Sequence, residues 1–301
     1  MLSRRRSLAL LLVVGLLAMT LASCSRSPGR VVGKFDLGGY QVFLYCLGEG
    51  EPTMLFDAGA GGNAYGLHDL VADAASRTRV CLWDRPGLGT SQAGPLPTSS
   101  LQIVGELREL LATADVPPPY LPVGFSFGGM NLRLFADQYA DEVVGLVLID
   151  PSHPDQFDRF AAVLPPRQPG ETPELRSFRE RDLGNPDVDM EASIEQVRGV
   201  TSLGDLPLVV VSRADDPAAM RFPGITEEVA EALHGEWMAM QEETSALSTR
   251  GRWVIAESAG HCVHCTEPAL VVEALETILG VRSEDGVPAE DGVRSGDEEA
   301  R

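Results

Sequence analysis

Short apolar runs alternate with longer amphipathic stretches along most of the chain. The runs are four to eight residues long and rich in Val, Leu and Ile, which is typical of strands buried on both faces of a sheet. They cover residues 40–47, 53–56, 79–83, 121–124, 145–149, 208–211 and 253–256. The amphipathic stretches predict helices over 66–76, 101–114, 129–139 and 270–279. This alternation predicts the α/β class, with a mostly parallel central sheet flanked by helices.

Two segments interrupt this alternation. Residues 151–206 are rich in Pro, Asp and Arg and have weak helical patterning, so we expect a small helical cap inserted over the sheet. Residues 281–301 repeat Glu-Asp-Gly-Val at positions 284 and 290 and carry few apolar side chains. Such composition predicts a disordered acidic tail. The folded domain is therefore expected over residues 31–280.

The first 23 residues have the pattern of an export signal. Three arginines at positions 4–6 precede an apolar stretch over 8–21. That stretch is shorter than the roughly 20 residues that a membrane-spanning helix needs, so residues 1–23 are predicted to be a secretory signal peptide.

The signal ends in Leu-Ala-Ser before Cys24, and this sequence resembles the lipobox of bacterial lipoproteins. The resemblance implies cleavage before Cys24, lipidation of its sulfur and attachment of the exported chain to the outer side of the cytoplasmic membrane. Several acyl chains together anchor a protein stably. Residues 24–30 are then expected to form a short tether.

Composition and charge narrow the choice of partners. With 44% apolar and 23% charged residues, the 301-residue chain can bury a large core. Its net charge is -20, and no basic cluster is visible in the sequence. Nucleic acid is therefore excluded as an expected partner, because phosphate binding needs a clustered basic face.

Four cysteines remain once Cys24 is assigned to lipidation. Export favours oxidised thiols, so the four remaining cysteines predict two disulfides. The residues alone leave three pairings open. The four are Cys46, Cys81, Cys262 and Cys265.

The last two cysteines also pose the question of a metal site. Cys262 and Cys265 stand close to His261 and His264. A structural zinc site usually has a second Cys or His pair, and the chain offers none at suitable spacing. No metal is therefore predicted.

A serine between glycines follows the apolar run at 121–124. The sequence is Gly124-Phe125-Ser126-Phe127-Gly128, and an amphipathic stretch comes directly after it. On a sharp turn from strand to helix a serine is exposed as a nucleophile, and the flanking glycines avoid collisions with the sheet and the helix. The N–H of Phe127 is then expected to bind a developing oxyanion.

The chain resembles serine hydrolases of the α/β-hydrolase fold over residues 31–280. The resemblance rests on the serine turn and on Val-Cys-Leu-Trp-Asp-Arg-Pro-Gly-Leu-Gly-Thr-Ser at 80–91. It implies that the second and fourth strands are neighbours, which would pair Cys46 with Cys81 and leave Cys262 for Cys265. It also implies a second oxyanion donor at Ala60, although Asp-Ala-Gly-Ala at 57–60 departs from the His-Gly of many relatives.

The same resemblance implies a base and an acid for Ser126. His261 follows the last predicted strand and is the expected base. The acid should lie between Ser126 and His261 in chain order. Asp216, after the run at 208–211, best matches the usual position, and Asp150 and Asp215 are alternatives.

These residues predict a carboxylic ester hydrolase that works through an acyl-enzyme. The expected substrate is a small molecule, and neither a metal nor an organic cofactor is needed. Two other functions stay open: an envelope aminopeptidase of the same fold, and a non-catalytic binding lipoprotein.

Overall fold

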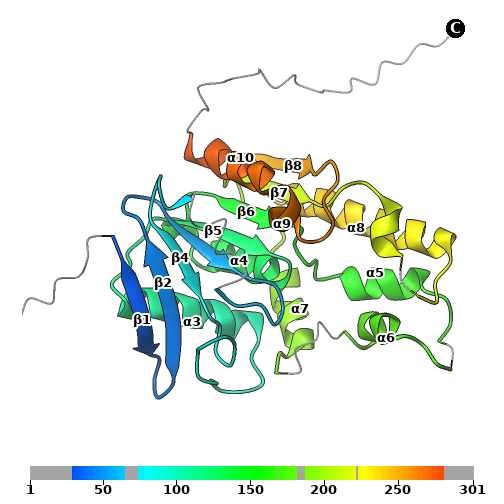
Figure 1. Cartoon of the computed structure of the whole chain (residues 1–301), viewed down its shortest axis with the longest axis horizontal. Helices are drawn as coiled ribbons and strands as arrows, with labels where there is room; N and C mark the ends of the chain where they lie inside the picture. The colour runs from blue at the N-terminus through cyan, green and yellow to red at the C-terminus, as the bar shows by residue number, and fades with distance from the viewer. Residues whose placement is uncertain (1–28, 65–73, 168, 182–186, 222, 281–301) are drawn as a thin grey trace, which may run out of the picture.

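The computed structural model describes residues 29–64, 74–167, 169–181, 187–221 and 223–280 (Figure 1). The expected signal peptide, the lipidation site at Cys24 and the tail over 281–301 lie outside these ranges, as does most of the helix expected over 66–76.

The described residues form one eight-stranded sheet with the order β1-β2-β4-β3-β5-β6-β7-β8. β1 and β2 are antiparallel to their neighbours, and all pairs from β4 to β8 are parallel. The strands are β1 (Val31–Asp36), β2 (Gln41–Leu47), β3 (Thr53–Asp57), β4 (Val80–Trp83), β5 (Tyr120–Phe125), β6 (Leu146–Ile149), β7 (Leu208–Ser212) and β8 (Gly251–Ile255). The predicted α/β class with a mostly parallel sheet is confirmed, and β1 is an additional strand.

Helices pack on both faces of this sheet. The helices of the described ranges are α3 (Ser100–Thr113), α4 (Phe127–Gln138), α5 (Gln156–Val163), α6 (Pro173–Glu180), α7 (Met190–Arg198), α8 (Glu227–Ser245), α9 (Val263–Thr266) and α10 (Pro268–Leu279), with short 3-10 turns at Ala140–Glu142 and Pro217–Met220. Sequence patterning did not predict α8. Its buried face includes His234, Gln241 and Thr244, so apolar periodicity is weak along the whole helix.

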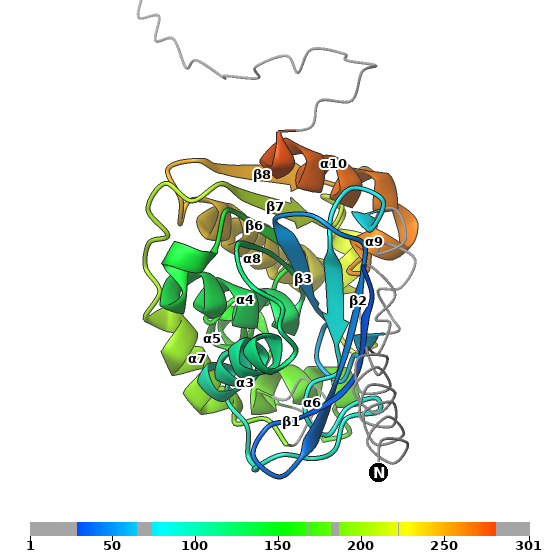
Figure 2. The same ribbon diagram turned by 90° about the vertical axis from the view of Figure 1, so that its left-hand side faces the viewer.

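Alternate strand residues divide the core into two layers. Leu55 and Leu148 join a cluster with residues of α3 and α4, whereas Phe56 and Val147 join one with residues of α10. Successive side chains of a strand point to opposite faces, so continuous apolar runs serve both layers. Figure 2 shows α3 and α4 on the same side of the strands.

The chain leaves the sheet after β6 and forms α5, α6 and α7 before it returns as β7. This excursion falls within the cap expected over 151–206. Figure 1 shows α5, α6 and α8 grouped to one side of the strands. Phe160 of α5 and Trp237 of α8 belong to one apolar cluster, so α8 supports the excursion. Within the described ranges, no helix combines the length and apolarity needed to cross a membrane.

Glu106 of α3 is buried, and its surroundings disfavour the ionised form of its carboxyl group. The hydroxyl of Tyr40 and the amide of Gln102 both donate to Oε1, while Oε2 has no partner among the described residues. Burial raises the pKa of Glu106 above its ordinary value and outweighs the lowering effect of these hydrogen bonds; the nearby Glu109 raises it further. Because the folded pKa is raised, the stabilising contribution of this group is present below the unfolded pKa and lost as pH rises through the folded one.

We therefore expect Glu106→Gln to raise the free energy of unfolding at pH 8 by on the order of 1 kcal/mol, since the neutral amide avoids burying a charge. At pH 4 the variant should gain little, because the wild-type acid is then protonated. Urea unfolding at the two pH values measures this difference. A variant that loses stability equally at both would contradict the explanation.

Candidate active site

Ser126 lies at the sharp turn between β5 and α4. Its backbone has φ 53° and ψ -120°, a conformation that residues other than glycine rarely adopt. The side chain faces the loop after β8, where His261 Nε2 is 3.0 Å from Ser126 Oγ. The turn therefore presents the hydroxyl to a nitrogen that can accept its proton.

Two glycines make this turn possible. A Cβ on Gly124 would lie 2.5 Å from Cα of Gly129, and a Cβ on Gly128 would lie 2.2 Å from the carbonyl oxygen of Asp57. Both obstacles are backbone atoms that a side-chain rotation cannot move. The glycines are therefore required by close approach of the turn to α4 and to the end of β3.

His261 connects the serine to a buried carboxylate. Its Nδ1 is 2.5 Å from Oδ2 of Asp150, the residue directly after β6. Its side chain is 44% exposed, and the ring of Phe125 lies beside it with centroids 4.8 Å apart. The imidazole thus has one nitrogen on the serine and the other on an acid, which is the arrangement of a general base and its orienting group.

The expected partnership of His261 with Asp216 is wrong in this structure. Asp216 is exposed and caps the 3-10 turn after β7, where its carboxylate accepts from the N–H of Ala218 at 2.9 Å. Asp215 instead pairs with His234 Nε2 at 2.9 Å. Of the three candidates only Asp150 contacts the histidine, whereas the carboxylates of Asp215 and Asp216 bind the partners just named.

Asp150 is fully buried, and both of its oxygens have partners. Oδ1 accepts from Trp237 Nε1 at 2.8 Å, and Oδ2 accepts from Arg213 Nη2 at 2.6 Å as well as facing His261. Burial by itself would raise the pKa of Asp150, but the hydrogen bond from His261 and the positive charge of Arg213 outweigh it. The pKa therefore lies below its usual range. The carboxylate is ionised at neutral pH.

The predicted oxyanion donors lie on two backbone segments beside Ser126. Phe127 is the first residue of α4, so its N–H has no acceptor within the helix. On the other side, a Cβ on Gly59 would come within 3.4 Å of Ser126 Cβ, so the backbone leading to Ala60 runs close to Ser126. The structure thus brings both segments to the serine.

Arg85 supports the second of these segments, a role that sequence reasoning missed. Its guanidinium donates to Asp57 Oδ1 at 2.8 Å, to the carbonyl of Ala58 at 2.7 Å and to the carbonyl of Gly59. Asn131 of α4 donates to the other oxygen of Asp57 at 3.1 Å. This buried ion pair holds the turn after β3 in place. The sequence signal for this role is the Asp-Arg pair in the block at 80–91, but the pattern of the block does not indicate which residues its arginine binds.

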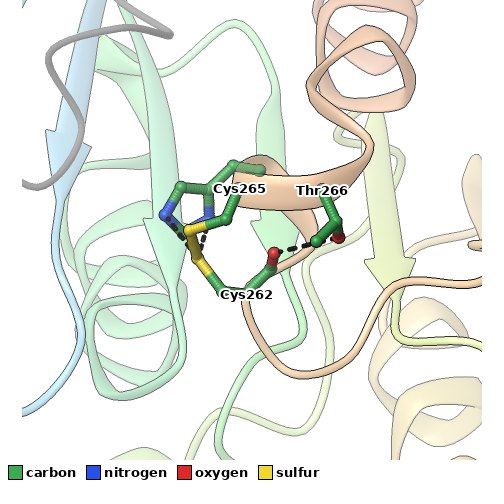
Figure 3. The surroundings of a disulfide bond; sticks show 4 residues. Cys262, Cys265 and Thr266 are labelled. Carbon is green, nitrogen blue, oxygen red and sulfur yellow. Dashed lines mark hydrogen bonds between the residues drawn. A yellow bond between two sulfur atoms is a disulfide. The ribbon is translucent and has the colours of Figure 1, made fainter.

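The structure joins the four cysteines into two disulfides. Cys46 and Cys81 face each other in the β2–β4 register, with Cα atoms 4.0 Å apart. Cys262 and Cys265 close a short loop directly after His261, and Figure 3 shows this bond beside Thr266, which donates to the carbonyl of Cys262.

His264 stands between the second disulfide and the serine turn. Its Nε2 is 3.3 Å from Cys262 Sγ, and its ring meets that of Phe125 with centroids 4.6 Å apart. Cys262, His264 and Cys265 lie close enough to share a metal ion, but the two sulfurs are bonded to each other and are not thiolates. Burial lowers the pKa of His264 to about 4, so the ring is neutral at pH 7.

Comparison with known proteins establishes the fold. The family described as alpha/beta hydrolase fold matches residues 52–193. An uncharacterized protein of Bacillus subtilis, YqjL, is 27% identical over 80% of this chain and 88% of its own length. A hydrolase from Pseudomonas aeruginosa covers 83% of this chain and 98% of its own with TM-score 0.57 and 19% identity. A thermophilic esterase from Thermogutta terrifontis covers the same shares with TM-score 0.57 and 20% identity.

Proposed function

From the α/β-hydrolase fold and the contacts of Ser126, we propose that the chain is a serine hydrolase that cleaves carboxylic esters through an acyl-enzyme. The observation that carries the proposal is the continuous chain of contacts from Ser126 through His261 to Asp150. The fold is shared with a thermophilic esterase and with a hydrolase, which supports the reaction class.

In the proposed reaction, Ser126 Oγ attacks the ester carbonyl while His261 Nε2 takes its proton. The N–H groups of Phe127 and Ala60 stabilise the negative oxygen of the tetrahedral intermediate. The intermediate collapses, His261 gives the proton to the leaving alcohol, and the acyl group remains on the serine. Water then attacks the acyl carbonyl with His261 again as base, the bond to Ser126 Oγ breaks as His261 returns the proton to Oγ, and the carboxylic acid is released. Asp150 holds the proton on Nδ1 throughout, so that Nε2 can act as acceptor.

The cap supports an ester substrate more than a peptide with a free amino terminus. An aminopeptidase needs an acidic group available for the substrate ammonium ion. In the described part of the cap, Asp155 and Asp158 bind Arg198, and Glu171 binds Arg179. These three carboxylates are already engaged in ion pairs with arginines. Rates with p-nitrophenyl esters of graded chain length, compared with aminoacyl anilides, test the two substrate classes directly.

A fluorophosphonate probe tests whether the protein is an enzyme at all. The proposal expects labelling of the wild type, none of Ser126→Ala, and loss of ester hydrolysis in that variant. Ser152→Ala is a matched control, because Ser152 lies near the site and its amide donates to the Ser126 carbonyl, but its hydroxyl is not in the proposed mechanism. A wild type that resists the probe and cleaves no ester would favour a binding protein.

We also propose that the protein is exported and anchored through Cys24 on the outer side of the cytoplasmic membrane. The support is the lipobox-like sequence before Cys24, together with two disulfides, which suit an oxidising compartment. Intact mass measurement of protein extracted from membranes should give a chain that begins at residue 24 and carries acyl groups. An unmodified chain in the soluble fraction would refute the anchor.

A further inference from the structure

The loop after β7 was expected to supply the acid, but it supplies a cation. Arg213 is the first residue after β7, and only 6% of its surface is exposed. Its Nε and Nη2 donate to Oδ2 of Asp150 at 2.8 and 2.6 Å, and its backbone N–H donates to Oδ1 at 3.2 Å. An arginine that binds one carboxylate with three groups is fixed in direction as well as in place.

Trp237 of α8 completes this arrangement. Its indole N–H donates to Oδ1 of Asp150 at 2.8 Å, and its ring lies 4.4 Å from the guanidinium carbon of Arg213. The arginine side chain and the tryptophan therefore bind opposite oxygens of the carboxylate, and their side chains also contact each other. Rotation of the carboxylate away from His261 would break hydrogen bonds to both, which are costly to lose in a buried position.

The position of Arg213 also affects which ring nitrogen of His261 carries the proton. Arg213 Nη2 lies 3.0 Å from His261 Nδ1, so carboxylate and guanidinium face the same ring nitrogen. When Nδ1 carries the proton it donates to Asp150, and Nε2 is free to accept from Ser126. A bare Nδ1 would accept from Arg213 instead, and Nε2 would then carry a proton toward the serine and could not act as base. Because Asp150 and Trp237 hold the guanidinium in place, the carboxylate remains the nearer partner of His261 Nδ1.

We propose that Arg213 is a positioning residue of the hydrolase reaction, which acts by fixing Asp150 against His261 with the help of Trp237. This inference rests on the proposed function. It assigns to the loop after β7 a role in orienting the acid that β6 provides, and it extends the site to α8.

The test measures kcat and KM for an ester substrate in Arg213→Met, Arg213→Lys and Trp237→Phe. A slightly misplaced acid should lower kcat about 100-fold in Arg213→Met with KM changed less than about threefold. Arg213→Lys keeps the charge without the fork and should fall between this variant and the wild type. Trp237→Phe keeps an aromatic side chain and loses the indole hydrogen bond, so a loss of about five- to tenfold in kcat is expected.

Two measurements separate positioning from a general loss of structure. Guanidinium ions added to Arg213→Ala should restore part of kcat, which a merely misfolded protein would not show. Arg133→Met is the matched control: Arg133 is also 6% exposed, and its guanidinium donates to the carbonyl of Val200 rather than to Asp150. It should lower the melting temperature with kcat nearly unchanged.

The outcomes are distinguishable. If the wild type hydrolyses esters and Arg213→Lys, Trp237→Phe and Arg213→Met all keep wild-type kcat, the positioning role is overturned and the hydrolase proposal stands. If Arg213→Met does not fold, unchanged kcat in Arg213→Lys and Trp237→Phe overturns it equally. If the wild type neither hydrolyses esters nor reacts with fluorophosphonate, the proposed function fails and the positioning role fails with it.

Discussion

Asp150→Asn should lower kcat for ester hydrolysis by about 10⁴-fold, whereas Asp216→Asn should stay within about threefold of the wild type. The asparagine keeps the size of the side chain but presents an amide group that no longer enforces a proton on Nδ1 of His261. The histidine then adopts the tautomer that cannot accept the proton of Ser126. Asp216 lies on the surface and caps a 3-10 turn, so its carboxylate does not contact the imidazole.

The comparison needs a check on folding, because Asp150→Asn leaves the buried Arg213 without its anion. We expect a lower melting temperature for this variant, and rates should be measured well below it. Stopped-flow labelling of Ser126 by a fluorophosphonate gives the same ratio independently of substrate binding. If Asp216→Asn were the slow variant, the acid would have to be reassigned and the observed contact between Asp150 and His261 would be unrelated to turnover.

Gly128→Ala should disable the site and destabilise the fold together. The added methyl group would lie 2.2 and 2.5 Å from the carbonyl oxygens of Asp57 and Ala58. Either α4 or the turn after β3 must move, and both carry proposed oxyanion donors. We expect a loss of about 1–3 kcal/mol in stability and about 100-fold in kcat.

Gly105→Ala is the control for this substitution. Gly105 lies inside α3, and an added Cβ there meets no atom within 4 Å. Alanine should therefore stabilise the helix by about 0.5–1 kcal/mol with unchanged kcat. Thermal unfolding and ester hydrolysis of both variants measure the contrast. Equal behaviour of the two would mean that the close approach at Gly128 is not what constrains the turn.

Much of the fold was predictable because its information is local. Apolar runs of strand length indicate strands that are buried on both faces. All seven predicted runs coincide with strands of the sheet. The second and fourth strands were expected to be neighbours on the resemblance, and they pair with Cys46 opposite Cys81. α8 escaped prediction, since its buried face carries polar residues, and a partner such as the carbonyl of Pro151, to which Gln241 donates, comes from a distant part of the chain.

The chain by itself determined the α/β class, the serine turn with its two glycines and the position of His261 after the last strand. It could not choose among Asp150, Asp215 and Asp216, because all three follow strands in a suitable order. That choice was made by the tertiary structure: Asp150 meets the histidine across 111 residues of sequence, whereas Asp215 binds His234 and Asp216 binds the N–H of Ala218. The places of Arg85 and Arg213 were decided in the same way. Local periodicity encodes which segments become strands and helices, whereas contacts between strand ends depend on the order of strands in the sheet.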